Sequence, residues 1–159
     1  MRTLAERQAA VVAALVAGAP APFDPDRVRA TAAALLRKRA GEVAAAWPML
    51  AASLGRDWQR SFAAWAAGRP PTGALRDGWD FARTFIDPGS ARRPKVRRCG
   101  GTVAPLAAEE LALRDALWVY DGTRAPRRRR LPAVRRCHGI VIIQIAGRVR
   151  RIDHRGPRT

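Results

Sequence analysis

Residues 47–65 read WPMLAASLGRDWQRSFAAW, and this stretch predicts two short consecutive helices. Because Pro48 disfavours the helical conformation in the residue before it, a preceding helix ends at Trp47 and the first of the two short helices begins at Pro48. Gly55 ends this first short helix. Three aromatic residues then follow at the i, i+4 and i+7 spacing of one helical face: Trp58, Phe62 and Trp65. We expect this face to be buried in the core.

Helical patterns continue on both sides of this stretch. Asp24-Pro25 has the form of an N-cap followed by proline at the first helical position, so it predicts the start of a long helix that ends at Trp47. The apolar stripe of that helix consists of Val28, Ala32, Leu35, Val43 and Trp47. A Gly- and Pro-rich loop at residues 68–73 precedes a further helix with the apolar positions Leu75, Trp79, Ala82, Phe85 and Ile86. Residues 1–86 are therefore predicted to form a bundle of about five helices.

The first residues of the chain have some features of a signal peptide. Arg2 and Arg7 flank the start of an alanine- and valine-rich segment, and Ala19-Pro20-Ala21 follows it. Glu6 interrupts the charged region, however, which favours an ordinary amphipathic helix. The apolar residues on one face of that helix are Leu4, Val11, Val12, Leu15 and Val16. We therefore expect a cytoplasmic protein that begins with a helix.

The composition excludes several classes of protein. Of the 159 residues, 48% are hydrophobic and 27% are charged, so a packed core is expected rather than disorder. No apolar run approaches the roughly 18–20 residues of a membrane span. The chain has 2 cysteines, too few for a disulfide framework. A mainly α protein with an Ala- and Leu-rich core fits these values.

The formal net charge of +17 is concentrated in the second half of the chain. Residues 1–86 hold 12 basic and 7 acidic residues, whereas residues 87–159 hold 18 basic and 6 acidic residues. Such a field attracts polyanions, namely nucleic acid, anionic lipid or an acidic protein. The alternative is that a GC-rich genome favours arginine over lysine, since only Lys38 and Lys95 are lysines.

The second half begins with a predicted basic linker at residues 87–104, which lack periodicity and contain several prolines and glycines. Residues 105–159 then form a second part, whose first element is a predicted helix over residues 105–120 with two apolar stripes. Leu106, Leu113, Leu117 and Tyr120 form one stripe, and Leu111 and Trp118 form the other. Such a helix packs between two surfaces. Either both surfaces belong to this chain, or one belongs to a partner.

The end of the chain is rich in arginine and in β-forming residues. Four arginines occupy Arg127–Arg130, and Leu131–Arg136 can form a short strand. Ile140–Ile145 is the most β-prone run, and Ala146-Gly147 can turn it back into residues 148–152. A small β-hairpin or three-stranded meander is therefore predicted. Its sheet needs a covering surface, which is either the helical domain or the sheet edge of another protein.

No complete catalytic or metal-binding constellation is visible in the sequence. The four potential zinc ligands lack the close spacing of Cys-x-x-Cys pairs: Cys99, Cys137, His138 and His154. Nothing places a third group to orient a Cys-His nucleophile. Four carboxylates on predicted helices are interpreted as solvated or as partners of the helix dipole: Asp77, Asp80, Glu109 and Glu110. We therefore predict no enzymatic activity, no cofactor and no metal.

Residues 24–86 carry a pattern of aromatic-Pro, Leu-Gly, an aromatic helix, a Pro-rich loop, Leu and Gly-x-x-Phe. Its elements here are Trp47-Pro48, Leu54-Gly55, Phe62 with Trp65, Pro70-Pro71, Leu75, and Gly78 to Phe81. This pattern resembles that of the small helical partner proteins encoded beside TIM-barrel multinuclear iron enzymes that modify peptide cysteines, as in methanobactin systems. An N-terminal domain of that family is labelled as DNA-binding. The chain looks closest to an actinobacterial branch with an Arg-rich tail.

The resemblance implies a non-catalytic accessory protein that docks onto an iron enzyme encoded nearby and helps to present its peptide substrate. Iron and chemistry then belong to the barrel of the enzyme. A single helix and a basic hairpin take the place of the larger α/β domain of better-known members. The predicted partner contacts are Leu111, Trp118, Arg127, Arg128, Arg129, Arg130 and the edge of Ile140–Ile145, with Ile140, Ile142 and Gln144.

Nucleic-acid binding is the alternative function, because the same arginines could contact phosphates. The Arg127–Arg130 run has no neighbouring aromatic stacking partner, and no recognition helix is visible. Salt separates the two functions. Binding to a polyanion weakens steeply as salt rises, whereas docking through an apolar helix survives moderate salt.

Overall fold

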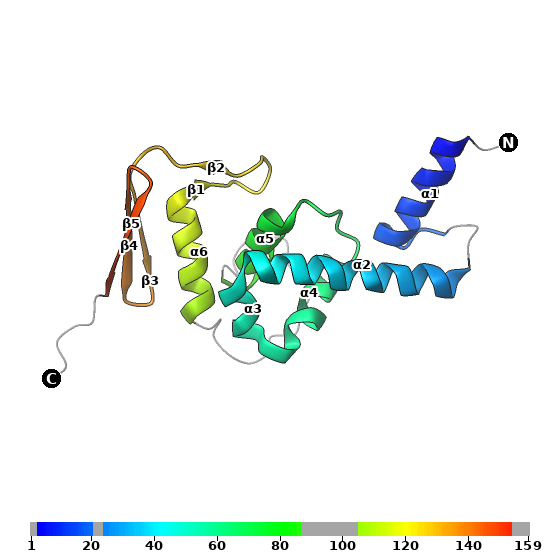
Figure 1. Cartoon of the computed structure of the whole chain (residues 1–159), viewed down its shortest axis with the longest axis horizontal. Helices are drawn as coiled ribbons and strands as arrows, with labels where there is room; N and C mark the ends of the chain where they lie inside the picture. Colours follow the sequence, from blue (N-terminus) through cyan, green and yellow to red (C-terminus); the bar gives the residue numbers. More distant parts are fainter. Residues whose placement is uncertain (1–2, 21–23, 87–104, 154–159) are drawn as a thin grey trace.

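The computed structural model of the chain describes residues 3–20, 24–86 and 105–153. Its helices are α1 (Leu4–Ala17), α2 (Pro25–Ala46), α3 (Pro48–Leu54), the 3₁₀ helix η1 (Gly55–Asp57), α4 (Trp58–Ala66), α5 (Ala74–Ile86) and α6 (Pro105–Leu117). Its strands are β1 (Trp118–Val119), β2 (Arg127–Arg128), β3 (Ala133–Cys137), β4 (Ile140–Ile145) and β5 (Arg148–Asp153). The prediction of a mainly α chain with a small C-terminal sheet is confirmed (Figure 1). The predicted linker at residues 87–104, which contains Cys99, lies outside the described residues. His154 also lies outside them.

The helix boundaries of the N-terminal half follow the predicted signals. Asp24 caps α2, because its carboxylate accepts a hydrogen bond from the backbone N–H of Asp26 at 2.9 Å. Trp47 separates α2 from α3, and α3 ends at Leu54 before Gly55. These boundaries are set by local chemistry, so the sequence around them was sufficient to place them.

The core of the bundle is aromatic and lies between α2, α4 and α5. Trp58, Phe62 and Trp65 are all buried, as their spacing predicted. Phe81 of α5 meets each of these three rings at centroid distances of 5.4–5.5 Å. Trp47 contacts the edge of a second α5 ring, that of Trp79, at 5.5 Å. Edge-to-face pairs of this kind stabilise the core beyond the area that they bury.

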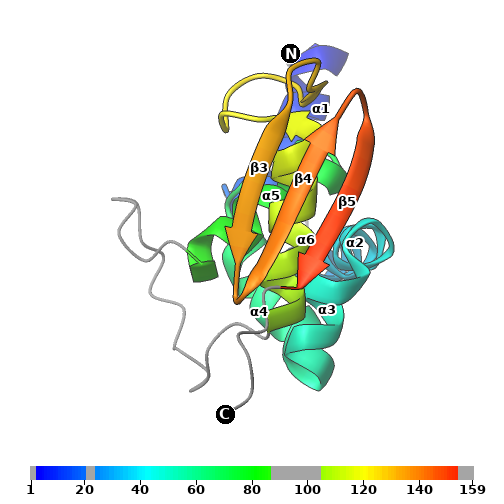
Figure 2. The same cartoon turned by 90° about the vertical axis from the view of Figure 1, so that its left-hand side faces the viewer.

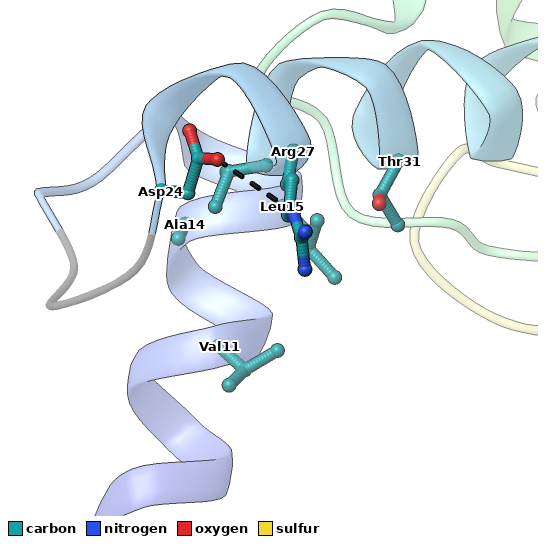
Figure 3. A pocket seen from close by; sticks show the side chains of 7 residues that line it. Val11, Ala14, Leu15, Asp24, Arg27 and Thr31 are labelled. Atoms are coloured by element: carbon teal, nitrogen blue, oxygen red, sulfur yellow. Dashed lines mark ion pairs between the residues drawn. The ribbon is translucent and has the colours of Figure 1, made fainter.

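Helix α1 packs against the first half of α2, away from the aromatic core (Figure 1). An open groove of about 590 Å³ lies between the two helices and is lined by Val11, Ala14, Leu15, Asp24, Arg27, Val28 and Thr31 (Figure 3). Asp24 and Arg27 form an ion pair of 3.6 Å, and both side chains are exposed. Because none of its polar lining residues is buried, the groove is a gap between two helices rather than a built ligand site.

Helix α6 lies between the helical bundle on one side and the sheet on the other (Figure 1). Both surfaces thus belong to this chain, which decides between the two alternatives left open by the sequence. Small side chains permit this double packing, because Ala107, Ala108 and Ala116 are buried. The predicted stripe of Leu106, Leu113, Leu117 and Tyr120 does not lie wholly against these surfaces, because Leu106 and Leu113 are 47% and 37% exposed.

The predicted helix over residues 105–120 is too long by three residues. It ends at Leu117, and Trp118–Val119 forms the strand β1, which pairs with β2. The following turn explains this ending. The Asp121 carboxylate accepts hydrogen bonds from the backbone N–H groups of Thr123 and Arg124 at 2.8 and 3.0 Å, so the chain reverses there and brings β2 beside β1.

The C-terminal sheet is an antiparallel meander in the order β3-β4-β5. Both of its turns have two residues with positive φ. In the first turn φ is 46° at His138 and 79° at Gly139, and in the second it is 49° at Ala146 and 80° at Gly147. Such turns match the twist of antiparallel strands. The strand Ile140–Ile145, expected at a sheet edge, is instead the central strand, because strands form on both sides of it.

Candidate functional site

The β1–β2 hairpin holds the first part of the predicted partner-binding surface. Trp118 is half-buried and packs against the core, and its partner in the strand register is Arg128. The Arg128 guanidinium lies 5.0 Å from the centroid of the indole ring. This cation–π contact places the guanidinium over the ring of the half-buried Trp118. The prediction that Trp118 lies on a helix stripe is therefore wrong. Trp118 lies in strand β1, beside Arg128.

The four consecutive arginines differ in their exposure. Arg127, Arg128 and Arg130 are exposed, and none of them has a carboxylate within 4.0 Å in the described part of the chain. Arg129 is half-buried, with its backbone N–H donating to the Leu117 carbonyl at 2.8 Å. Because the Arg128 guanidinium lies against Trp118, the groups of Arg127 and Arg130 remain to bind carboxylates or phosphates.

The other predicted contact residues lie mostly inside the molecule. Leu111 is buried in the helical core, and Ile142 and Gln144 are 2% and 0% exposed. Ile140 is half-buried on the same face of β4 as these two. This face packs on α6, so the three predicted contact residues of β4 lie between the sheet and that helix. The outward set of β4, which begins with Val141, was missed, although the same alternation identifies it.

Gln144 has a structural role in the sheet. The groups around Gln144 assign its amide nitrogen to the Leu131 carbonyl at 3.0 Å and its oxygen to the Gly147 N–H at 2.8 Å, and in this orientation both ends of the amide are hydrogen-bonded. These bonds join the start of β3 to the turn after β4. A fully buried amide with two backbone partners stabilises the meander and offers nothing to a partner protein.

Two carboxylates predicted to be solvated are buried, which corrects that interpretation. Asp77 is 2% exposed and accepts hydrogen bonds from Arg39 Nε at 2.7 Å and from the Thr72 hydroxyl at 2.6 Å. Glu110 is 8% exposed and accepts a hydrogen bond from the backbone N–H of Leu50 at 2.9 Å. Each carboxylate joins segments far apart in the sequence, so both serve the fold.

A third polar cluster fastens the end of α6 and β1 to α5. The Tyr120 hydroxyl donates to both carboxylate oxygens of Asp80, at 2.9 and 3.0 Å. The guanidinium groups of Arg76 and Arg83 lie 5.8 and 5.1 Å from the centroid of the Tyr120 ring. Burial raises the pKa of the Asp80 carboxyl, although the hydrogen bond from Tyr120 opposes this shift, and burial also raises the pKa of Tyr120.

The remaining candidate ligands do not assemble into a site within the described ranges. Burial and, to a lesser extent, the charge of Glu109 raise the pKa of the Cys137 thiol, which favours its neutral form. No three His, Cys, Asp or Glu residues among those described could hold a metal ion. His138 is exposed in the turn after Cys137. Likewise, no helix in residues 3–20, 24–86 and 105–153 is long and apolar enough to cross a membrane.

We expect Glu110→Ala to lower the free energy of unfolding by about 2–3 kcal/mol. The substitution leaves the buried N–H of Leu50 without an acceptor and removes the carboxylate 3.5 Å from Arg114. Glu109→Ala is the matched control. Among the described residues, Glu109 forms its ion pair with the exposed Arg151, so its loss should cost less than about 1 kcal/mol. Urea unfolding followed by tryptophan fluorescence measures both, and equal losses would contradict the capping role of Glu110.

Comparison with known proteins places the chain in a family. Residues 5–87 match the family model described as SCO6045-like, C-terminal domain. A UPF0276 protein of Streptomyces avermitilis is 42% identical to the chain over 98 residues, which are 60% of this chain but 20% of that protein. The match thus spans about a fifth of the length of this relative. No solved structure matches the chain. Since the family model matches more than half of its residues, the chain belongs to the family of the SCO6045-like C-terminal domain.

Proposed function

We propose that the chain is a non-catalytic accessory protein that docks onto a multinuclear-iron peptide-modifying enzyme encoded nearby and helps to present its substrate. In this proposal the protein acts in the cytoplasm, and the iron and the chemistry belong to the enzyme. The resemblance of residues 24–86 to such partner proteins motivates the proposal. Asp77 and Glu110 already have structural partners, so these two buried carboxylates are engaged in the fold and are not free for acid–base chemistry.

The observation that carries this proposal is the size of the Streptomyces avermitilis relative. Its segment similar to this chain makes up 20% of its length, so the other four fifths lie outside the match. Joining two domains in one polypeptide raises their effective concentration and favours pairs that act in contact. We infer that the segment works against the remainder of that protein, and that this chain works against an equivalent enzyme.

The arginines of the β1–β2 hairpin are the proposed docking contacts with the enzyme. Arg127 and Arg130 are exposed and have no carboxylate partner within the described residues. Charged groups of this kind steer association and bind carboxylates of a partner. The edges of β3 and β5, which pair with no further strand among the described residues, are the candidate sites for an extended peptide substrate, because an edge strand offers unpaired backbone groups.

A tagged pull-down from the native host tests the proposal. It should be done at about 150 mM salt, where the Debye length is about 8 Å and charge pairs at an interface still contribute, and with nuclease added so that bound nucleic acid is removed. Stoichiometric recovery of the iron enzyme, identified by mass spectrometry, is the expected result. We expect Arg127→Glu with Arg130→Glu to reduce recovery severalfold, because the change reverses two exposed charges. Recovery of no protein partner would contradict the proposal.

Nucleic-acid binding is the second candidate function. Two features favour it, the exposed arginines and the net charge of +17. The aromatic residues weaken this alternative. Among those whose side chains are described, all are buried except the half-buried Trp118, which Arg128 covers, so no ring is open for base stacking. Retention of nucleic acid without nuclease, with an affinity that falls steeply as salt rises, would favour this candidate.

A further inference from the structure

The meander has an inner face that α6 covers and an outer face that no described element covers. Figure 2 shows the three strands in front with α6 behind them. The strand register assigns side chains to the two faces. Ile142 and Gln144 are on the inner face, and neighbouring residues of β4 point the other way. Val134 pairs with Ile143, and Val141 pairs with Ile152, so these four side chains share the outer face.

The outer face is aliphatic and exposed. Val134, Ile145 and Ile152 are 52%, 59% and 50% exposed, and Val141 and Ile143 between them are half-buried. These five residues come from all three strands and are neighbours in the register. Single exposed aliphatic residues are ordinary, but a contiguous group with a polar rim marks an interaction site.

Three arginines border this aliphatic group. Arg136 pairs with Val141 in the register, Arg150 with Ile143, and Arg148 with Ile145, so all three guanidinium groups belong to the outer face. None of the three has a carboxylate within 4.0 Å among the described residues. The inner face differs, since its Arg151 pairs with both Glu109 and Asp153. The outer face therefore presents aliphatic and unpaired basic groups together.

The positive charge of the outer face limits which molecule or chain segment can cover it. Residues 87–104 hold five basic residues and one acidic residue, and residues 154–159 hold two arginines and no acidic residue, so neither segment complements Arg136, Arg148 and Arg150. A second copy in a symmetric contact would present the same face, which carries these three arginines and no carboxylate. Nucleic acid would satisfy the arginines but offers no aliphatic surface. A protein surface with both carboxylates and aliphatic side chains satisfies the whole face.

The dimensions of the face fit one helix. Three strands spaced about 4.8 Å apart span about 10 Å, close to the diameter of a helix with its side chains. A strand of six residues is about 20 Å long, which a helix of about 13 residues matches. Helix α6, with 13 residues, packs in this way on the inner face of β3 and β4. A second helix on the outer face would complete a three-layer arrangement.

We propose that the outer face of the meander, formed by Val134, Arg136, Val141, Ile143, Ile145, Arg148, Arg150 and Ile152, docks an acidic amphipathic helix of the partner protein. This inference rests on the proposed accessory function and adds a second contact surface, with its chemistry, to the arginines of the β1–β2 hairpin. The aliphatic side chains of the helix cover the centre of the face. Its Asp and Glu side chains pair with the arginines at the border.

A synthetic peptide tests this contact on the full chain. The probe is a fluorescein-labelled peptide of about 16 residues with leucine on one helical face and glutamate on the other, and a peptide of the same composition in scrambled order is its control. We expect the amphipathic peptide to bind at least tenfold more tightly than the scrambled one, measured by fluorescence anisotropy. Arg148→Glu with Arg150→Glu should weaken its binding about tenfold or more. The matched control, Arg37→Glu with Arg56→Glu, reverses two exposed arginines of the helical bundle and should change binding less than twofold.

Three results would overturn the inference: equal binding of the two peptides, equal loss in the two double variants, or tighter binding of a short DNA duplex through Arg148 and Arg150. Circular dichroism checks that both variants keep the fold. The same variants in the pull-down separate this inference from the proposed function. If the iron enzyme binds the Arg148→Glu, Arg150→Glu variant as well as the native chain, the inference fails and the accessory function stands. If the peptide binds as expected but no enzyme is recovered, the accessory function fails and the chemistry of the face is supported.

Discussion

Gly78→Ala is expected to lower the free energy of unfolding by about 3 kcal/mol, at the upper end of the usual cost of overpacking a core. A Cβ atom at position 78 would lie 2.1 Å from both Cδ1 and Nε1 of Trp47. The indole ring has little room to move, because Trp47 is fully buried and its Nε1–H donates to the Leu75 carbonyl at 3.1 Å. Trp79 also packs against it at 5.5 Å. The glycine of the Gly-x-x-Phe pattern thus serves the contact between α5 and Trp47.

Gly41→Ala is the matched control for Gly78→Ala. Gly41 lies inside α2, and a Cβ atom there would meet nothing within 4 Å. Alanine is the better helix former, so this change should raise the free energy of unfolding by about 0.5–1 kcal/mol. Urea unfolding monitored by tryptophan fluorescence gives both values. A loss below about 1 kcal/mol for Gly78→Ala would contradict the close approach of α5 to Trp47.

Asp77→Ala is expected to destabilise the chain by about 3–5 kcal/mol, because it breaks a buried ion pair by removing one partner. Arg39 is held in place by its carbonyl contacts, donating to Arg69 O at 2.8 Å and to Pro70 O at 3.2 Å, and its side chain is 12% exposed. Without Asp77 its charge would remain in a mostly buried position. The Thr72 hydroxyl would also lose its acceptor.

Asp26→Ala removes a carboxylate of the same type from an exposed pair. Asp26 and Arg29 have side chains that are 81% and 72% exposed, so this loss should cost less than about 1 kcal/mol. Both substitutions are measured by urea unfolding at the same pH. Comparable losses in Asp26→Ala and Asp77→Ala would show that the Arg39–Asp77 pair does not hold the 68–73 loop against α2.

The helical bundle was predictable because its signals are local. The Trp47-Pro48 junction, Gly55 and the Asp24 cap each act within a few residues, and the structure has boundaries at all three. The burial of Trp58 and its two neighbours on α4 followed from periodicity alone. Family resemblance was carried by the same residues, which shape the bundle rather than any binding surface.

The partner-binding residues were harder to predict because their placement depends on distant segments. Alternation grouped Ile142 with Gln144, but only the position of α6 decides which side of the sheet is buried. Trp118 continued the helical pattern, yet pairing with Arg128, ten residues later, made it a strand. Asp77 and Glu110 looked solvated, since their partners lie 38 and 60 residues away in the sequence.

The accessory function is tested most directly by sedimentation velocity of the purified chain mixed with the purified iron enzyme encoded beside it. The mixture should contain nuclease, so that bound nucleic acid is removed, and about 150 mM salt, at which the arginine contacts with the enzyme still contribute. We predict a complex of defined stoichiometry that sediments faster than either protein alone. If the two proteins sediment separately, the accessory function is contradicted. A separate sample of the chain without nuclease, at the same concentration, shows whether it still binds DNA.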